Sequence, residues 1–236
     1  MPTLRIVGPG RAGLSLSRAL DAAGWRVLAP LGRGDDLTGA ADGTDLLVLA
    51  TPDGVVGDVA AAIDPVDTAV VAHMAGSLGL APLGPHRRRS SIHPLVALPD
   101  PDLGARRLRG AWFAVAGDPL GRRVVDDLGG TAIDVADDDR AAYHAAACVA
   151  SNHLVALLGS VQRIAATAGV PLEAYLDLVR ATVDNVEALG VDRALTGPAA
   201  RGDWDTIERH RAVLPERERA AYEALLELIR EPATCR

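Results

Sequence analysis

The first thirteen residues constrain the fold of this chain more than any other segment. An apolar run at residues 4–7 is followed by Gly8, Gly10 and Gly13 in G-x-G-x-x-G spacing. From Ala12 the apolar residues recur every three to four positions up to Gly24, which is typical of a helix. A second strand-like run then covers residues 25–29. Strand, glycine-rich turn, helix and strand together indicate a βαβ unit that binds a dinucleotide; the alternative is a glycine-rich turn without a ligand.

The glycines of this turn have different physical roles. Gly8 permits a tight turn, Gly10 lets the backbone approach a pyrophosphate, and Gly13 lets the helix pack closely on the strand. The phosphates would then bind unpaired N–H groups at the helix N-terminus. We therefore predict a cofactor-binding loop formed by Gly8, Pro9, Gly10, Arg11, Ala12 and Gly13.

The first half of the chain continues with short apolar runs separated by helical segments. Strands are predicted at residues 45–50, 69–72, 90–93, 112–116 and 131–135. Helices are predicted at residues 54–63 and 119–128. Because continuously apolar strands are typical of sheets covered on both faces, we predict an α/β fold with a doubly wound, mostly parallel Rossmann sheet.

The pattern changes at the acidic run of residues 137–139. Beyond it only helices are predicted, at residues 140–168, 172–190, 204–214 and 215–230. We therefore expect a dinucleotide-binding domain at residues 1–136 and an all-helical domain at residues 137–236. The first of these helices is apolar around its whole circumference, which is typical of a domain centre or a dimer interface.

Composition excludes several functional classes. The formal net charge of −7 disfavours nucleic-acid binding. No apolar stretch approaches the roughly 20 residues of a membrane span, and the strand-like start leaves no room for a signal peptide. We expect no disulfide between Cys148 and Cys235 and no metal site, because the histidines are scattered and cysteines are few. These features predict a cytoplasmic protein that acts on a small molecule.

The chain contains no lysine. All 24 basic residues are arginines, so a lysine acid, base or Schiff base is excluded from any mechanism.

The residues after the second strand indicate which nucleotide binds. NAD-binding folds carry an acidic residue about 20 positions past the first glycine, where it binds the ribose 2′-hydroxyl. That position falls near Leu28, where there is no acid, and the next polar side chain is Arg33. Because arginine suits the 2′-phosphate, we predict NADP. Asp35 and Asp36 leave NAD open as the alternative.

Polar residues follow three of the predicted strands, and ligands of doubly wound sheets bind at such strand ends. Thr51 and Pro52 follow one strand, and His73 and Ser77 follow the next; these four are predicted cofactor contacts. His93 ends a third strand and is a candidate catalytic residue. The alternative for each histidine is a structural role in which it satisfies loop carbonyl groups.

The helical region adds two further candidate groups. His144, Cys148 and Asn152 recur every four residues and so share one helix face. We predict that His144 moves a proton and that Asn152 holds the substrate, with mutual hydrogen bonding as the alternative. Between later helices lie the predicted substrate contacts Thr196, Arg201 and Asp203. Arg201 would bind a substrate carboxylate or pair with Asp203.

Several of these segments together resemble one family. They comprise residues 8–13, 51–53, 73–77, 91–95, 143–147, 150–152 and 195–203. The chain is similar to Rossmann-like proteins whose helical C-terminal domain is the domain of unknown function 2520. That group resembles ketopantoate reductase, pyrroline-5-carboxylate reductase and the F420-dependent NADP oxidoreductases.

The resemblance implies an NADP-binding domain, a helical dimerising domain and reduction of a small carbonyl or imine, with ketopantoate as the named candidate substrate. Ketopantoate reductases use a lysine in the long helix, and this chain has none, so His144 or His93 would have to supply the proton. A non-catalytic NADP-binding regulatory dimer and an F420-dependent enzyme are the alternatives.

Overall fold

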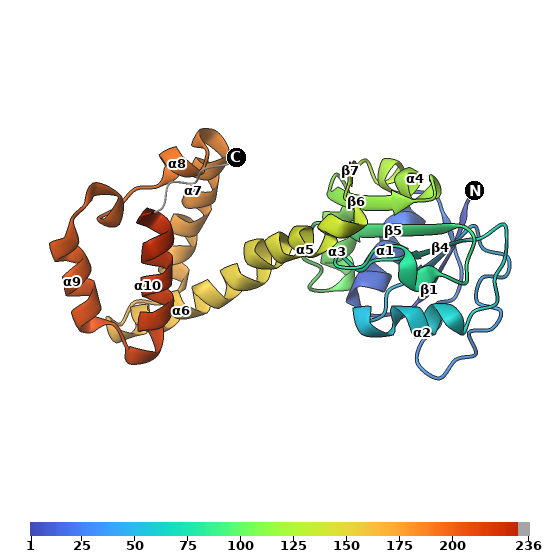
Figure 1. Ribbon diagram of the computed structural model, residues 1–236, viewed down its shortest axis with the longest axis horizontal. Helices are drawn as coiled ribbons and strands as arrows, with labels where there is room; N and C mark the ends of the chain where they lie inside the picture. Colours follow the sequence, from blue (N-terminus) through green and yellow to red (C-terminus); the bar gives the residue numbers. More distant parts are fainter. Residues whose placement is uncertain (231–236) are drawn as a thin grey trace. The chain divides into compact units, whose positions relative to one another are not determined.

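The computed structural model describes residues 1–230, and Figure 1 follows the chain through them. Cys235 and the prediction made for it lie outside the described residues. The chain divides into two compact units, Met1–Ser151 and Asn152–Arg236.

The first unit is built on a seven-stranded sheet. Its strands lie in the order β2-β1-β3-β4-β5-β6-β7. Their bounds are β1 Thr3–Val7, β2 Arg26–Val27, β3 Leu46–Leu49, β4 Val70–His73, β5 Arg89–Pro94, β6 Trp112–Gly117 and β7 Thr131–Asp134. The first five strands pair in parallel, whereas β5 and β6 are antiparallel. The predicted α/β fold with a mostly parallel sheet is confirmed.

Helices cover both faces of this sheet. Helices α1 (Arg11–Ala22), α3 (Pro101–Leu108) and α4 (Leu120–Asp127) bury one face, and α2 (Val56–Ala61) buries the other. Strand β3 is continuously apolar because it contributes to the cores on both faces of the sheet. Leu46 and Val48 belong to one core, and Leu47 and Leu49 belong to the other. Short helical turns η1 (Asp53–Val55) and η2 (Ala81–Leu83) precede and follow α2 along the chain. The core thus fixes the strand ends on which site residues are placed.

Helix α3 is absent from the sequence-based prediction. Asp100 is its N-cap and accepts hydrogen bonds from the backbone N–H groups of Asp102 and Leu103, while Pro101 occupies the first turn. An Asp-Pro pair of this kind is a helix-start signal. The rest of α3 is short and shows too few repeats of an amphipathic pattern to predict a helix. The hydrophobic pattern alone therefore did not identify α3.

The predicted long helix is present but interrupted. A short turn, η3 (Asp137–Asp139), leads into α5 (Arg140–Cys148), then a π-helical segment, η4 (Val149–His153), and then α6 (Leu154–Thr167). The compact units separate inside η4, later than the predicted boundary at residues 136/137. The buried Arg140 side chain explains this difference, because its bond to Ser91 fastens α5 to the first unit.

The described part of the second unit contains helices and no strand, as the pattern after residue 140 predicts. Beyond α6 it has α7 (Glu173–Leu189), α8 (Val191–Ala194), η5 (Ala199–Arg201), α9 (Trp204–Val213) and α10 (Glu216–Arg230). Glu218 of α10 is 3% exposed and accepts hydrogen bonds from Ser160 and Arg163 of α6 and from Arg217. This buried carboxylate fastens α10 to α6.

One helical stretch corrects the expectation about membrane spans. Residues 137–167 form a helical stretch that contains an 18-residue window of mean hydropathy 1.3, and 6% of that window is buried. By length and composition alone, this stretch is long and apolar enough to cross a membrane. A single helix of this kind is weak evidence for a membrane span.

Candidate functional site

The glycine-rich loop has one open glycine between two enclosed ones. Gly8 has φ +93°, and a methyl group added there would lie 2.8 Å from the Ala50 carbonyl oxygen. A methyl group on Gly13 would lie 2.5 Å from the Gly8 carbonyl oxygen. Gly10 is exposed, and a methyl group there would meet nothing within 4 Å. Gly8 and Gly13 are therefore required by the fold, whereas space above Gly10 remains for a ligand.

The N-terminus of α1 suits an anion beside this open position. Gly10 is the N-cap and offers no side chain to bind the first N–H groups, and the first turn carries no acidic residue. Unpaired N–H groups and the helix dipole both favour a phosphate there. The residues present therefore fit the pyrophosphate of a dinucleotide.

Arg33 lies in a loop next to the glycines. The backbone N–H of Gly8 donates to the Leu31 carbonyl at 2.8 Å, and a methyl group on Gly32 would touch Pro9 at 3.6 Å. Arg33 is exposed, and among residues 1–230 no hydrogen bond or ion pair engages its guanidinium.

The two acids that could instead bind a ribose are occupied. Asp35 accepts a hydrogen bond from the Gly32 N–H at 2.7 Å, and Asp36 accepts from both the backbone N–H and the hydroxyl of Thr38. Those bonds from Thr38 lower the pKa of Asp36. Arg33 is thus the charged side chain of this loop whose polar atoms no hydrogen bond engages among residues 1–230.

The ends of β3 and β4 hold the other predicted cofactor contacts. Pro52 is exposed, whereas the Thr51 hydroxyl is buried and has no hydrogen-bond partner within the described chain. Ser77 donates to Asp53 at 2.7 Å. His73 is fully buried, and its Nε2 is bonded to the Gly79 carbonyl at 2.9 Å. Burial lowers the pKa of His73, so the structure gives this histidine the alternative, loop-holding role.

The segment after β4 is held from a second direction. Asp137 of η3 accepts a long hydrogen bond, 3.4 Å, from the Leu80 N–H, and its carboxylate lies where a side chain at Gly79 would be. We call residues 74–80 the β4 loop. His73 and Asp137 together fix its path.

At the end of β5, His93 meets two residues of α5. Its Nδ1 lies 2.7 Å from the Tyr143 hydroxyl. The His93 ring packs edge-on against Tyr143 and His144, with centroid distances of 5.5 and 5.8 Å. Gly76 of the β4 loop closes this cluster, because a methyl group there would lie 2.6 Å from His144 and 2.8 Å from His93 Nε2.

The protonation states in this cluster follow from its burial. Burial, assisted by the neighbouring His144 and by the charge of Arg140, lowers the pKa of His93 to about 4. Burial raises the pKa of Tyr143, although the charge of Arg140 opposes that change. At neutral pH the cluster therefore holds a neutral imidazole hydrogen-bonded to a protonated phenol.

Arg140 completes the cluster from the first turn of α5. Its side chain is 1% exposed, and Nη1 donates to the Ser91 hydroxyl at 3.0 Å. Its Nε and Nη2 are buried and have no hydrogen-bond partner among the described residues. Burial lowers the pKa of this guanidinium, and nearby Asp137 raises it.

The structure thus joins some predicted residues and adds others. It brings His93 and His144 together, and His144 also approaches Cys148, with 4.0 Å between Nε2 and Sγ. Sequence reasoning assigned no role to Tyr143 or Arg140. The spacing from Arg140 was the available signal, since Tyr143 and His144 stand three and four positions after it and positions i, i+3 and i+4 share a helix face.

The remaining candidates belong to the second unit. Asn152, Thr196, Arg201 and Asp203 are all exposed. Asp203 is the N-cap of α9 and accepts bonds from the N–H and hydroxyl of Thr206. Within residues 1–230 no ion pair joins Arg201 to Asp203.

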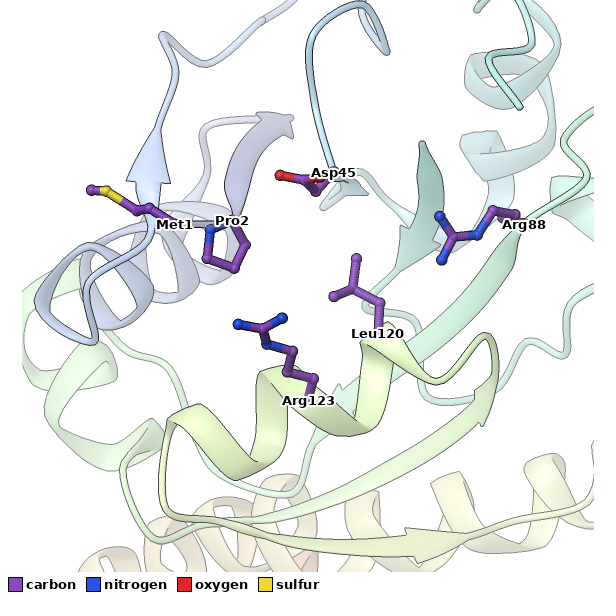
Figure 2. Close-up of a pocket in the computed structure, with 6 residues that line it drawn as sticks. All are labelled: Met1, Pro2, Asp45, Arg88, Leu120 and Arg123. Atoms are coloured by element: carbon purple, nitrogen blue, oxygen red, sulfur yellow. The ribbon is translucent and has the colours of Figure 1, made fainter. Parts of the chain in front are cut away.

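A hollow of about 300 Å³ lies at the opposite, amino-terminal edge of the sheet, and Figure 2 shows its lining. It is lined by Met1, Pro2, Asp45, Arg88, Leu120 and Arg123. Asp45 is bonded to the Thr3 N–H, and Arg88 is bonded to Asp118 and the Thr68 carbonyl. Its main charged groups are therefore already paired, and ligands of such sheets bind at the other edge. In the described chain no group of three or more His, Cys, Asp or Glu could hold a metal ion.

Comparisons with known proteins identify one family domain in this chain. The model of a family described as a domain of unknown function, DUF2520, matches residues 113–229. No curated protein matches the chain.

Solved structures share the whole fold. A Bacteroides fragilis protein named as a candidate NADP oxidoreductase superposes with a TM-score of 0.80 at 18% identity, covering 97% of both chains. A Plasmodium falciparum pyrroline carboxylate reductase with NADP bound gives 0.65 at 14% identity, covering 97% of both chains. An Aspergillus terreus reductive aminase in complex with NADPH and ethyl levulinate gives 0.68 at 14% identity, covering 96% of this chain and 93% of that chain. These likenesses show a Rossmann-like fold followed by a helical region.

Proposed function

Because the chain carries a DUF2520 domain on a Rossmann-like fold, we propose that it is an NADPH-dependent reductase of a small carbonyl or imine. The observation that carries this proposal is the His93–Tyr143 pair, which places a protonated phenol at the end of β5. Carbonyl and imine reduction both need such a proton donor.

NADPH would bind along residues 8–13, with Arg33 at the 2′-phosphate. The open space above Gly10 and the uncapped N-terminus of α1 support the pyrophosphate position. The engagement of Asp35 and Asp36 supports NADP over NAD. Solved structures with this fold include complexes with NADP and with NADPH. When bound, the reduced nicotinamide supplies a hydride.

The chain's own residues then handle the proton. The Tyr143 hydroxyl gives its proton to the substrate oxygen or nitrogen as the hydride reaches the adjacent carbon. His93, in the tautomer with a proton on Nδ1, returns a proton to Tyr143 and takes one from solvent at Nε2. His93 is neutral at pH 7, so it acts as a relay rather than as an imidazolium acid. His144 packs on its ring and orients it.

In the second unit, the proposed substrate contacts are Asn152, Thr196, Arg201 and Asp203. This part of the proposal rests on the sequence pattern alone. Ketopantoate is the proposed substrate, on the resemblance alone. The absence of lysine requires a proton donor other than the helix lysine of ketopantoate reductases, and Tyr143 fits that role.

We further propose a cytoplasmic homodimer that buries the helical unit. Helices α6 and α7 expose large apolar side chains, among them Val155 at 68%, Leu178 at 64% and Val183 at 55%. Apolar surface of this extent on a helix pair is typical of an interface. Light scattering after gel filtration measures the assembly, and a monomer would contradict it.

Activity is tested by following NADPH oxidation against ketopantoate, other 2-oxo acids and cyclic imines. Tyr143→Phe should lower kcat by at least about 100-fold and leave NADPH affinity unchanged. Tyr175→Phe, in the second unit, is the matched control and should retain wild-type turnover.

The alternatives correspond to distinct outcomes. NADPH binding without turnover of any substrate would indicate the regulatory dimer, and turnover only with reduced F420 would indicate the deazaflavin enzyme. Absence of NADPH binding would refute the proposal.

A further inference from the structure

The Arg140 guanidinium is an uncompensated buried charge beside the proposed proton donor. Only Nη1 has a partner, the Ser91 hydroxyl, while Nε and Nη2 are covered and unpaired within the described chain. A buried cation without a full set of acceptors destabilises a fold. Its presence therefore calls for a functional explanation.

Helix α5 and strand β5 place this charge close to Tyr143. Arg140 and Tyr143 are three residues apart on one helix face, and they contact Ser91 and His93, which are two residues apart on one strand face. Because alternate residues of a strand lie roughly 7 Å apart, we take a separation of that order between the guanidinium and the phenol oxygen, and the charge of Arg140 acts on the Tyr143 pKa.

Two carboxylates near the cluster offset this field in part, but the charge that acts on the Tyr143 pKa is that of Arg140. Asp137 favours the charge on Arg140 but forms no ion pair with it, and its carboxylate accepts from the Leu80 N–H instead. Asp53 is bonded to Ser77. The two histidines facing His93, His73 and His144, add no negative charge.

We propose that Arg140 is a positioning residue of the reduction site, whose buried positive charge stabilises the negative charge that develops on the Tyr143 oxygen as its proton leaves. This inference rests on the proposed reductase function. In the step, the substrate C=O or C=N bond becomes single, a C–H bond forms with hydride from a reduced nicotinamide, and an O–H or N–H bond forms with the Tyr143 proton. The nicotinamide is oxidised and the substrate reduced. The transient phenolate faces the Arg140 field, and a fixed charge aimed at developing charge is an effective form of transition-state stabilisation.

The test is a titration that needs no substrate. The ultraviolet absorbance change of Tyr143 on ionisation is isolated as the difference between the wild-type chain and Tyr143→Phe, and the same difference is measured in an Arg140→Met background. Removing a charge at about 7 Å, with an effective dielectric constant of about 20, should move the Tyr143 titration up by about one to two pH units. The His93 titration, followed by NMR, should also move upward from about 4. Arg122→Met, which removes an exposed arginine paired with Asp134, should move neither.

Kinetics provide the second readout. Arg140→Met should lower kcat about tenfold or more, with the KM and the NADPH Kd unchanged. Arg140→Lys should restore part of kcat because it restores the charge. If wild-type protein shows no reductase activity but the titrations move, the proposed function fails and the electrostatic role stands.

Unmoved titrations in folded Arg140→Met protein would overturn the proposal, as would a change confined to KM. Arg140→Gln replaces the Met variant if that variant does not fold. Failure of both neutral variants to fold would show that the charge is a requirement of the fold, and would equally overturn the proposal.

Discussion

Substituting the second and third glycines of the nucleotide loop, Gly10 and Gly13, should separate binding from folding. In Gly10→Ala the new methyl group meets no atom within 4 Å, and the residue has φ −79°, which alanine adopts freely. The expected cost is that of an alanine N-cap, under about 1 kcal/mol of unfolding free energy. For a unit of this size that lowers the Tm by at most about 4 °C. In the holoprotein the methyl group would occupy the space proposed for the pyrophosphate, so the NADPH Kd should rise at least about tenfold.

Gly13→Ala should show the reverse pattern. Its methyl group would lie 2.5 Å from the Gly8 carbonyl oxygen and 2.7 Å from an Ile6 methyl group. Overpacking of this kind costs about 1–3 kcal/mol, so the Tm should fall distinctly further than in Gly10→Ala. Thermal unfolding and isothermal titration with NADPH measure both effects.

Gly57→Ala in α2 is the matched control, since its methyl group would make only ordinary contact with Pro82 of η2. It should leave the NADPH Kd unchanged. Wild-type affinity in Gly10→Ala would refute the proposal that the loop holds the pyrophosphate.

Three further predictions follow from single side chains. Arg33→Ala should weaken NADPH binding about tenfold or more but leave NADH binding unchanged, because the guanidinium would contact only the 2′-phosphate; equal weakening of both would contradict that role. Gly76→Ala should displace His93 and His144 and abolish turnover while NADPH still binds, as a titration with NADPH would show. Glu218 has a pKa lowered to about 2 by Arg163 and Ser160, so its ionised form stabilises the fold fully above the unfolded pKa near 4.5 and this contribution is lost as pH falls through about 2. Glu218→Gln should therefore lower the Tm at pH 7, by an amount that shrinks from pH 4.5 towards pH 2.

The centre of the sheet was predictable because its strands are buried on both faces. A run such as residues 46–49 must be apolar at every position, and runs of this kind identify β3 and β4. The glycine triplet identified the loop before α1 for a similar reason, since the fold itself requires Gly8 and Gly13. Periodicity and spacing carry this information locally.

The cluster at β5 depends on packing that periodicity does not encode. Tyr143 and His93 are 50 positions apart, and their bond requires α5 to lie against the end of β5. Arg140 directly follows three aspartates, a composition typical of an exposed segment, so the local sequence does not indicate that it is buried. In the structure, however, Arg140 is 1% exposed. The π-helical turn at Val149–His153 likewise has the composition of an ordinary helix, so no sequence period distinguishes it.

The path of the β4 loop has a thermodynamic consequence. His73 bonds the Gly79 carbonyl and Asp137 accepts from the neighbouring Leu80 N–H, so the end of β4 and the sequence-distant turn η3 hold the loop. In this conformation Gly76 lies against His93 and His144. A ligand that binds at these histidines would therefore meet a preorganised surface. Little conformational entropy would then be lost on binding, and amide hydrogen exchange in residues 74–80 should be nearly as slow before a ligand is added as after.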